Sequence, residues 1–252
     1  MYKVTPKKAL GQHFLNDETI AEKIVHSITV NNSNILEIGP GMGILTQFLL
    51  QYENKDFKVI EIDNESVVYL QNKYPDLQII FGDFLKMNLS DYYEDTLTII
   101  GNFPYNISSQ ILFKVLENKD KVTELVGMFQ KEVAERIASK QGKKTYGILS
   151  VLLQAFYDIE YLFTVDAHLF TPPPQVKSAI IRMVRNPEKQ LRCDEVLFKN
   201  VIKTAFNQRR KTLRNSLKSF SFTEEYKGNS IFGQRPEQLS VEEFEDICLN
   251  CL

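Results

Sequence analysis

The chain has 252 residues, of which 43% are hydrophobic and 25% are charged. This composition is that of an ordinary soluble globular protein and excludes a disordered chain. The formal net charge of −2 argues weakly against a nucleic-acid partner, because proteins that bind phosphates usually carry a basic excess.

Cysteines and histidines are few. The three cysteines, Cys193, Cys248 and Cys251, lie late in the chain, and a second C-x-x-C pair is absent from the sequence. We therefore expect no zinc site and no other metal centre. So few cysteines favour a reducing compartment. No signal-peptide pattern is visible, and no apolar run approaches the roughly 18 residues of a membrane span, so we expect a cytoplasmic protein without a membrane partner.

Short apolar runs alternate with amphipathic stretches between residues 34 and 184. The runs predict strands at Ile35–Ile38, Phe57–Glu61, Leu77–Phe81, Leu97–Gly101, Leu125–Phe129, Tyr161–Thr164 and Ser178–Val184. Helical periodicity predicts helices at Ile44–Gln51, Glu65–Lys73, Ser108–Leu116, Lys131–Ser139 and Gly147–Tyr157. Buried parallel strands that alternate with helices predict an α/β fold with a doubly wound sheet.

The last part of the pattern differs from the rest. No long helix separates the last two predicted strands, which predicts an antiparallel last strand, with Pro172-Pro173-Pro174 in the connection. After Asn186-Pro187 the strand pattern stops, and residues 194–249 have helical patterns. We therefore expect two domains, residues 1–185 and a small all-helical domain of residues 186–252.

A glycine-rich segment, Gly39-Pro40-Gly41-Met42-Gly43, follows the first predicted strand. Glycines let the backbone turn sharply and approach a ligand, which the amides of the following helix then face. Ile44 stands where a dinucleotide-binding motif has its third glycine, so a nucleoside cofactor fits better than a dinucleotide. A tight turn without a ligand is the alternative.

Acidic residues follow the next two predicted strands. Glu61 can accept hydrogen bonds from both hydroxyls of a ribose. Asp83 can accept one from the adenine amine of the same cofactor. Asp63 is placed to cap the helix that follows it. Acids after successive strands, at one edge of the sheet, favour a ligand site over a ligand-free turn.

The fourth predicted strand leads into Asn102-Phe103-Pro104-Tyr105, at the edge where open α/β sheets bind ligands. The side-chain oxygen of Asn102 and the carbonyl of Pro104 can both accept hydrogen bonds from an exocyclic adenine amine. Such acceptors stabilise the positive charge that develops on that nitrogen during methyl transfer. Tyr105 can stack on the base and hold it in line. The alternative is a polar loop before a capped helix.

Several segments together resemble the ribosomal RNA adenine dimethyltransferase family. They are Lys7–Asp17, Ile35–Gly43, Val59–Asp63, Gly82-Asp83, Gly101–Ser108, Gln130–Arg136, Tyr146–Val151 and Phe170–Ala179. The resemblance implies a Rossmann-like class I methyltransferase fold and S-adenosylmethionine as cofactor. It also implies dimethylation of two adjacent adenosines near the 3′ end of small-subunit ribosomal RNA, during small-subunit biogenesis.

The resemblance also assigns roles to single residues. The cofactor-binding positions that it implies are His13, Leu15, Gly39, Gly41, Glu61, Asp83 and Asn102. The catalytic positions that it implies are Asn102, Pro104, Tyr105 and Phe170, of which Phe170 closes over a flipped-out adenine. The family more often has asparagine in place of His13 and an aliphatic residue in place of Phe103. Phe170 also has a packing interpretation, because an aromatic residue before a proline run often lies under a loop.

Basic residues cluster despite the negative net charge. Arg209, Arg210, Lys211 and Arg214 lie in an interval without acids, and Lys3, Lys7 and Lys8 form a second cluster. These clusters can contact phosphates of small-subunit ribosomal RNA, free or in a partly assembled subunit. A solvated helix face is the alternative for the first cluster. We expect the protein to act as a monomer.

Other functions remain open at this stage. A large-subunit adenine methyltransferase of the antibiotic-resistance type shares the fold and the tetrapeptide, but the full Gln130–Arg136 and Phe170–Ala179 segments favour the small-subunit branch. A non-catalytic assembly or RNA-binding factor is possible on the same scaffold. Lost catalysis is disfavoured because Glu61, Asp83, Asn102 and Tyr105 are all intact. A DNA adenine methyltransferase is disfavoured because no DNA-reading insertion is evident.

Overall fold

The structure is a computed structural model that describes residues 4–30, 33–52 and 56–252. The chain forms two compact units. The first contains Met1–Ala134 and Glu160–Arg185, and the second contains Glu135–Ile159 and Asn186–Leu252. The predicted division after Arg185 falls at the last change of unit, and the second unit also contains Glu135–Ile159.

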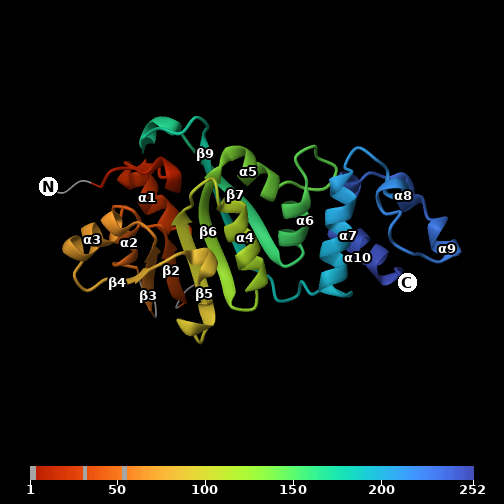
Figure 1. Cartoon of the computed structure of the whole chain (residues 1–252), viewed down its shortest axis with the longest axis horizontal. Helices are drawn as coiled ribbons and strands as arrows, with labels where there is room; N and C mark the ends of the chain where they lie inside the picture. Colours follow the sequence, from red (N-terminus) through yellow and green to blue (C-terminus); the bar gives the residue numbers. More distant parts are fainter. Residues whose placement is uncertain (1–3, 31–32, 53–55) are drawn as a thin grey trace. The chain divides into compact units, whose positions relative to one another are not determined.

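A seven-stranded sheet has the order β4-β3-β2-β5-β6-β9-β7 (Figure 1). Its strands are β2 (Asn34–Ile38), β3 (Phe57–Glu61), β4 (Gln78–Phe81), β5 (Leu97–Asn102), β6 (Val122–Gln130), β7 (Tyr157–Val165) and β9 (Ser178–Arg185). Strands β4, β3, β2, β5 and β6 run parallel, and β9 pairs antiparallel with β6. The predicted doubly wound α/β sheet with an antiparallel last strand is confirmed.

Helices follow the strands in chain order. They are α1 (Glu18–Val25), α2 (Thr46–Leu49), α3 (Asn64–Lys73), α4 (Ser108–Glu117), α5 (Lys131–Ile137) and α6 (Ile148–Gln154). The side chain of Asp63 accepts a hydrogen bond from the Glu65 amide at the start of α3, which confirms the predicted cap. The 3-10 helices are η1 (Lys8–Leu10), η2 (Phe84–Lys86), η3 (Leu89–Asp91) and η4 (Ala167–Leu169).

The predicted helices at 44–51, 131–139 and 147–157 are longer than α2, α5 and α6, and α1 was not predicted. α6 ends at Gln154, and Tyr157 begins β7, because the aromatic and β-branched residues that follow suit an extended chain. α2 covers only the middle of the predicted 44–51 helix, since turns of the glycine segment precede it. α1 begins at an aspartate cap, in which Asp17 accepts a hydrogen bond from the Ile20 amide.

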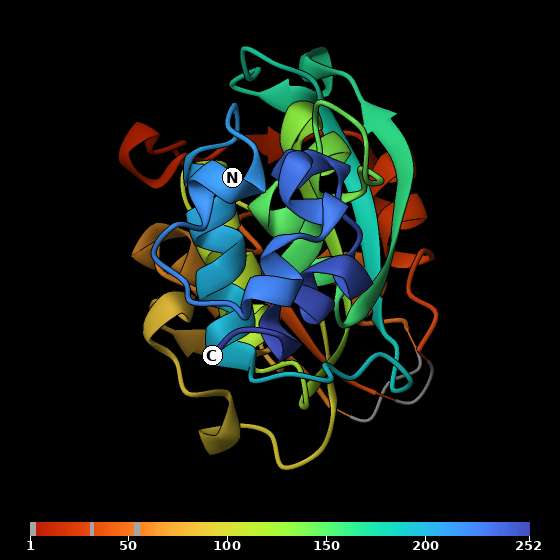
Figure 2. The same ribbon diagram turned by 90° about the vertical axis from the view of Figure 1, so that its right-hand side faces the viewer.

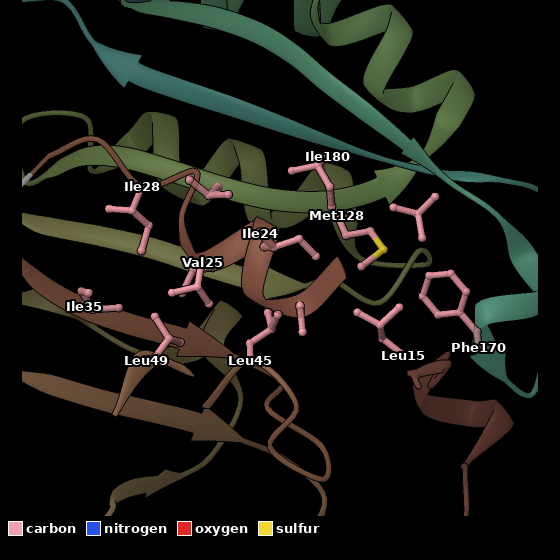
Figure 3. Close-up of a cluster of buried hydrophobic side chains, with 14 residues drawn as sticks. Leu15, Ile24, Val25, Ile28, Ile35, Leu45, Leu49, Met128, Phe170 and Ile180 are labelled. Atoms are coloured by element: carbon pink, nitrogen blue, oxygen red, sulfur yellow. The ribbon is translucent and has the colours of Figure 1, made fainter. Parts of the chain in front are cut away.

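A small antiparallel ribbon joins two distant parts of the first unit. β1 (Phe14–Leu15) pairs with β8 (Phe170–Thr171), with Leu15 opposite Phe170. Both side chains belong to a buried hydrophobic cluster that includes Ile24 of α1, Met128 of β6 and Ile180 of β9 (Figure 3). The ribbon was not predicted, because two residues are too few to show a period.

The second unit contains helices at its C-terminal end. They are α7 (Glu195–Asn207), α8 (Leu213–Ser216), α9 (Glu224–Lys227) and α10 (Val241–Leu249), with η5 (Ser230–Gly233) and η6 (Pro236–Gln238) between them. α7 and α10 pack beside each other (Figures 1 and 2), and the rings of Phe206 and Phe244 lie 6.0 Å apart.

No helix in the described ranges is long and apolar enough to cross a membrane.

Glu124 of β6 is a fully buried carboxylate in the first unit. It accepts hydrogen bonds from the backbone amide and hydroxyl of Thr29, at 2.9 and 2.7 Å, and from the amide of Val30 at 3.0 Å. Glu124 therefore fixes the connection that follows α1 at Thr29 and Val30.

Replacing Glu124 by alanine should lower the free energy of unfolding by about 3 kcal/mol or more, because three donors lose a charged acceptor. Urea unfolding followed by circular dichroism measures this change. The matched control is Glu117→Ala at the exposed end of α4, which should shift stability by less than about 0.5 kcal/mol. Equal stability of the two variants would show that Glu124 does not hold this connection.

Candidate active site

A cavity lies in the first unit, at the edge where β2, β3, β4 and β5 end. It brings together eight of the predicted site residues, His13, Gly39, Gly41, Glu61, Asp83, Asn102, Pro104 and Tyr105. Leu15 and Phe170 do not line it. No group of three His, Cys, Asp or Glu side chains that could hold a metal occurs within the described residues.

The glycine segment bends under the cavity. Gly39 and Gly41 have φ angles of 66° and 56°, which side-chain-bearing residues rarely adopt. A Cβ on Gly41 would meet the Phe14 ring at 2.7 Å, whereas a Cβ on Gly39 would meet no atom within 4 Å. The backbone at Gly39 therefore faces open space, as close approach by a ligand requires.

Glu61 joins the end of β3 to the glycine segment. One carboxylate oxygen accepts the Gly41 amide at 3.2 Å, and the other accepts the amides of Ile62 and Asp63 at 2.8 and 2.9 Å. Burial raises the pKa of Glu61, and these three hydrogen bonds oppose that rise. A carboxylate has about four acceptor positions, so Glu61 retains capacity for a ligand hydroxyl.

Asp83 follows β4. One carboxylate oxygen accepts the Leu85 amide at 2.9 Å, at the start of η2. Its second oxygen has no hydrogen-bond partner among the described residues. Asp83 lines the cavity and can accept a hydrogen bond from a ligand amine there.

Asn102, at the end of β5, has a fixed amide orientation. Its Nδ2 donates to the His13 carbonyl at 2.8 Å. Because a carbonyl only accepts, the nitrogen must lie on that side, which leaves Oδ1 as the acceptor for a ligand. The Pro104 carbonyl accepts the Ile107 amide at 3.2 Å and retains its second lone pair.

The Tyr105 side chain is held at its hydroxyl group and at its ring. Its hydroxyl forms a hydrogen bond with Ser178 Oγ of β9, and burial raises its pKa, so the phenol stays neutral at physiological pH. Its ring stacks on the His13 ring, with centroids 5.6 Å apart and an interplanar angle of 23°. His13 Nδ1 in turn donates to the Pro172 carbonyl at 2.7 Å.

The segment before β1 is attached to the end of β3 through Asp63. Lys7 forms an ion pair with the buried Asp63 and with Glu65, and Gln12 Nε2 donates to Asp63 at 3.1 Å. Burial alone raises the pKa of Asp63, but the hydrogen bonds from Lys7 and Gln12 hold it below its ordinary value. These two roles were not predicted, because no local pattern links residue 7 or 12 to residue 63.

Leu15 and Phe170 lie in the hydrophobic cluster, where they are 3% and 2% exposed. Figure 3 shows the Phe170 ring at the same end of that cluster as Leu15. This position agrees with the packing interpretation that the sequence left open for Phe170. The contact of Phe170 with a target base, and that of Leu15 with a cofactor, stay predictions.

Phe103 occupies a space that two glycines create. Gly101 of β5 and Gly127 of β6 lie opposite each other in register. A Cβ would meet the Phe103 ring at 2.8 Å from Gly101 and at 2.3 Å from Gly127. The ring is 1% exposed and packs edge-on against Phe129. This glycine pair accounts for a phenylalanine in the tetrapeptide of residues 102–105.

The basic run lies in the second unit. Arg209 donates to the Lys144 carbonyl and pairs with Glu237 at 3.7 Å, so it holds two segments of this unit together. Arg210, Lys211 and Arg214 are exposed. In the other predicted cluster Lys7 is paired with acids, Lys8 is exposed, and Lys3 lies outside the described residues.

The family model described as ribosomal RNA adenine dimethylase matches residues 4–248. The chain belongs to this family. The resemblance inferred from the sequence segments is therefore confirmed.

Relatives cover nearly the whole chain. Proteins named ribosomal RNA small subunit methyltransferase A are 59% identical in Cytophaga hutchinsonii and 57% identical in Parabacteroides distasonis. Each match spans 98% of this chain, and 97% and 94% of the respective relative. The protein of that name from Flavobacterium johnsoniae is 58% identical over 97% of this chain and 95% of its own length.

Two solved structures share the fold. A dimethyladenosine transferase from Plasmodium falciparum has a TM-score of 0.81 at 24% identity, covering 94% of this chain and 96% of that one. The 23S rRNA methyltransferase ErmE has a TM-score of 0.72 at 23% identity, covering 93% and 99%. At these identities the likeness concerns the fold, and it confirms the predicted methyltransferase fold class.

Gly127→Ala should destabilise the protein by about 1–3 kcal/mol and lower methyl transfer, because the new methyl group displaces Phe103 within the tetrapeptide. Phe103→Leu in the same chain should recover part of both losses. Thermal unfolding and methyl-transfer activity are measured for the wild type, the two single variants and the double variant, which together form a double-mutant cycle. Strictly additive effects would mean that Gly127 and Phe103 do not share this space.

Proposed function

We propose that this protein transfers methyl groups from S-adenosylmethionine to the exocyclic amines of two adjacent adenosines near the 3′ end of small-subunit ribosomal RNA. The observation that carries the proposal is the orientation of Asn102, whose Oδ1 is left as an acceptor in a cavity that also contains Glu61 and Asp83. Membership of the family supports it, as does the printed name of the relatives. We place its action in the cytoplasm, as a monomer, during small-subunit biogenesis.

The residues of the cavity fit S-adenosylmethionine. Glu61 can accept a ribose hydroxyl, Asp83 can accept the adenine amine, and the backbone at Gly39 is open to close approach. The cavity lining includes these two carboxylates and, among the described residues, no lysine or arginine. This charge suits a sulfonium cation and opposes a pyrophosphate. When bound, the cofactor supplies an electrophilic methyl group.

The tetrapeptide then compensates for a poor nucleophile. The lone pair of the adenine amine is delocalised into the ring, and the nitrogen gains positive charge as the new bond forms. Asn102 Oδ1 and the Pro104 carbonyl are preorganised acceptors for that amine, so their hydrogen bonds strengthen in the transition state. Tyr105, fixed through Ser178 and His13, provides a rigid surface that orients the base.

The target base must leave its helix to reach these acceptors. A base inside a duplex cannot present its amine to the methyl group, so the adenosine has to be unpaired or flipped out. One face of Tyr105 is covered by His13, so a base stacks on the other face. We propose that residues 186–252 hold the RNA backbone through Arg210, Lys211 and Arg214, which are exposed.

Asn102→Ala should reduce methyl transfer about 100-fold or more at saturating cofactor, the effect of losing one preorganised hydrogen bond to developing charge. RNA affinity should stay within about twofold, because the lost bond acts in the transition state. The assay incubates undermethylated small subunits with labelled S-adenosylmethionine and maps the modified nucleotides by mass spectrometry. The matched control is Asn72→Ala on the exposed side of α3.

Three outcomes would contradict this function or support one of its alternatives. Normal turnover of Asn102→Ala would make the tetrapeptide structural. No methylation by the wild-type protein, together with tight binding to the subunits, would support the non-catalytic assembly factor. Methylation of large-subunit RNA in place of small-subunit RNA would support the antibiotic-resistance type.

Replacing Arg210 and Lys211 by glutamine should weaken RNA binding. It should also reduce the magnitude of the slope of log affinity against log salt concentration by about 1–2. Arg209 is kept because it bonds within the second unit. Turnover at saturating RNA should be nearly unchanged, since neither residue lines the cavity. A salt dependence identical to wild type would place the RNA on another surface.

A further inference from the structure

One wall of the cavity is formed by the segment that precedes β1, and residues 9–14 all line it. Every residue from Thr5 to Phe14 is exposed or half-buried. Val4 and Leu15, on either side of this segment, are buried. Burial of apolar surface therefore holds the two ends of the segment, and polar contacts must hold its middle.

These polar contacts form a closed ring with Asp63. One carboxylate oxygen pairs with the Lys7 ammonium, and the other accepts Gln12 Nε2 at 3.1 Å. The carboxamide oxygen of Gln12 accepts the Lys7 backbone amide at 2.8 Å. Lys7 also pairs with the partly exposed Glu65 at 3.1 Å, a contact that solvent weakens. One buried aspartate thus holds both ends of the turn from Lys7 to Gln12, hereafter the Lys7–Gln12 turn.

Asp63 is itself fixed to the end of β3. Its backbone amide donates to Glu61 at 2.9 Å, and its carboxylate accepts the Glu65 amide at 3.1 Å. Its side chain is 1% exposed. Neither Asp63 nor Lys7 is among the described residues that line the cavity. Asp63 is therefore placed to support the wall of the cavity, and not to contact a ligand inside it.

The Lys7–Gln12 turn leads directly into the residue that orients the proposed acceptor. Gln12 is followed by His13, whose carbonyl accepts Asn102 Nδ2 at 2.8 Å. The His13 ring also stacks on Tyr105. A shift of the turn would move this carbonyl, which decides whether the oxygen or the nitrogen of the Asn102 amide is available to a substrate.

We propose that Asp63 is a positioning residue for methyl transfer. This inference rests on the proposed function. By holding Lys7 and Gln12, Asp63 fixes the turn that precedes His13. His13 then keeps the Asn102 amide in the orientation that offers Oδ1 to the adenine amine. A misplacement of about 1 Å can cost about 100-fold in rate, so a loosened turn lowers turnover.

The test uses variants at both ends of the ion pair. Asp63→Asn keeps the shape of the side chain and removes its charge, and Lys7→Met removes the ammonium and keeps the apolar stem. Lys7→Arg restores the positive charge and tests for rescue. The matched control for the aspartate is Asp76→Asn, in the exposed turn before β4. Circular dichroism confirms that each variant is folded.

Hydrogen–deuterium exchange shows whether Asp63 holds the Lys7–Gln12 turn. The amides of Leu10 and Gly11 both donate to carbonyls within this turn at 3.0 Å. In Asp63→Asn and Lys7→Met, the peptide that contains them should exchange about tenfold faster, because the turn opens more often. Lys7→Arg and Asp76→Asn should exchange at close to the wild-type rate. Equal exchange in all variants would overturn the proposal.

Turnover shows whether the turn acts through Asn102. With small subunits and S-adenosylmethionine both saturating, Asp63→Asn and Lys7→Met should each lower kcat about tenfold. The double variant should lose little more than either single variant, because both break one ion pair. Lys7→Arg should recover most of kcat. If Lys7 only contacted RNA phosphates, Lys7→Met would change KM for the subunits and leave kcat intact, which would overturn the proposal.

The Asn102→Ala background separates positioning from a general loss of stability. In that background no Asn102 amide remains for His13 to orient, so adding Asp63→Asn should lower kcat less than about threefold. An equal tenfold loss in both backgrounds would contradict the proposal, because Asp63 would then act on the fold as a whole.

The proposed function fails separately. If the wild-type protein methylates no small subunits, the enzyme assignment is wrong. The side-chain amide resonance of Asn102, identified by its loss in Asn102→Ala, still tests the positioning by nuclear magnetic resonance. A shifted resonance in Asp63→Asn and Lys7→Met, with none in Asp76→Asn, supports it. An unchanged resonance in both variants overturns it.

Discussion

Parallel pairing of β4, β3, β2 and β5 brings the ends of four strands to one edge of the sheet. Each end carries one part of the site: the glycine segment after β2, Glu61 at the end of β3, Asp83 after β4 and Asn102 at the end of β5. The Glu61 carboxylate links two of these parts by accepting the Gly41 amide. The carboxyl edge thus becomes a cavity with two carboxylates, which suits a cationic nucleoside cofactor.

The N-terminal segment, residues 7–15, covers this edge and contacts the tetrapeptide of residues 102–105. It is attached to the end of β3 through Asp63, to the tetrapeptide through the His13 carbonyl and to β8 through the ribbon. Its bond to Asn102 decides which amide atom is available to a substrate. His13 also stacks on Tyr105, so this one residue positions the side chains of Asn102 and Tyr105. The residues proposed to bind the cofactor and those proposed to bind the target base therefore line one cavity.

Residues at strand ends could be predicted, because strand periodicity and the parallel order fix where Glu61, Asp83 and Asn102 must meet. Contacts between distant segments could not. The bonds from His13 to Pro172 and from Tyr105 to Ser178 span 159 and 73 residues, and no local pattern encodes them. The switch from α6 to β7 was misplaced because Ala155 and Phe156 suit either period. Phe170 lies in the hydrophobic cluster, where burial supports packing, and its contact with a target base rests on family resemblance.

Calorimetric titration of S-adenosylmethionine tests most directly whether this sheet edge is the cofactor site. Glu61→Gln is the informative variant, since an amide keeps the shape of the carboxylate that holds three backbone amides. Wild-type protein should bind one equivalent. The variant should bind about tenfold or more weakly, with a folded structure by circular dichroism, as loss of a hydrogen bond to a charged group requires. Unchanged affinity in the folded variant, or binding of NADH in place of S-adenosylmethionine, would contradict the cofactor site.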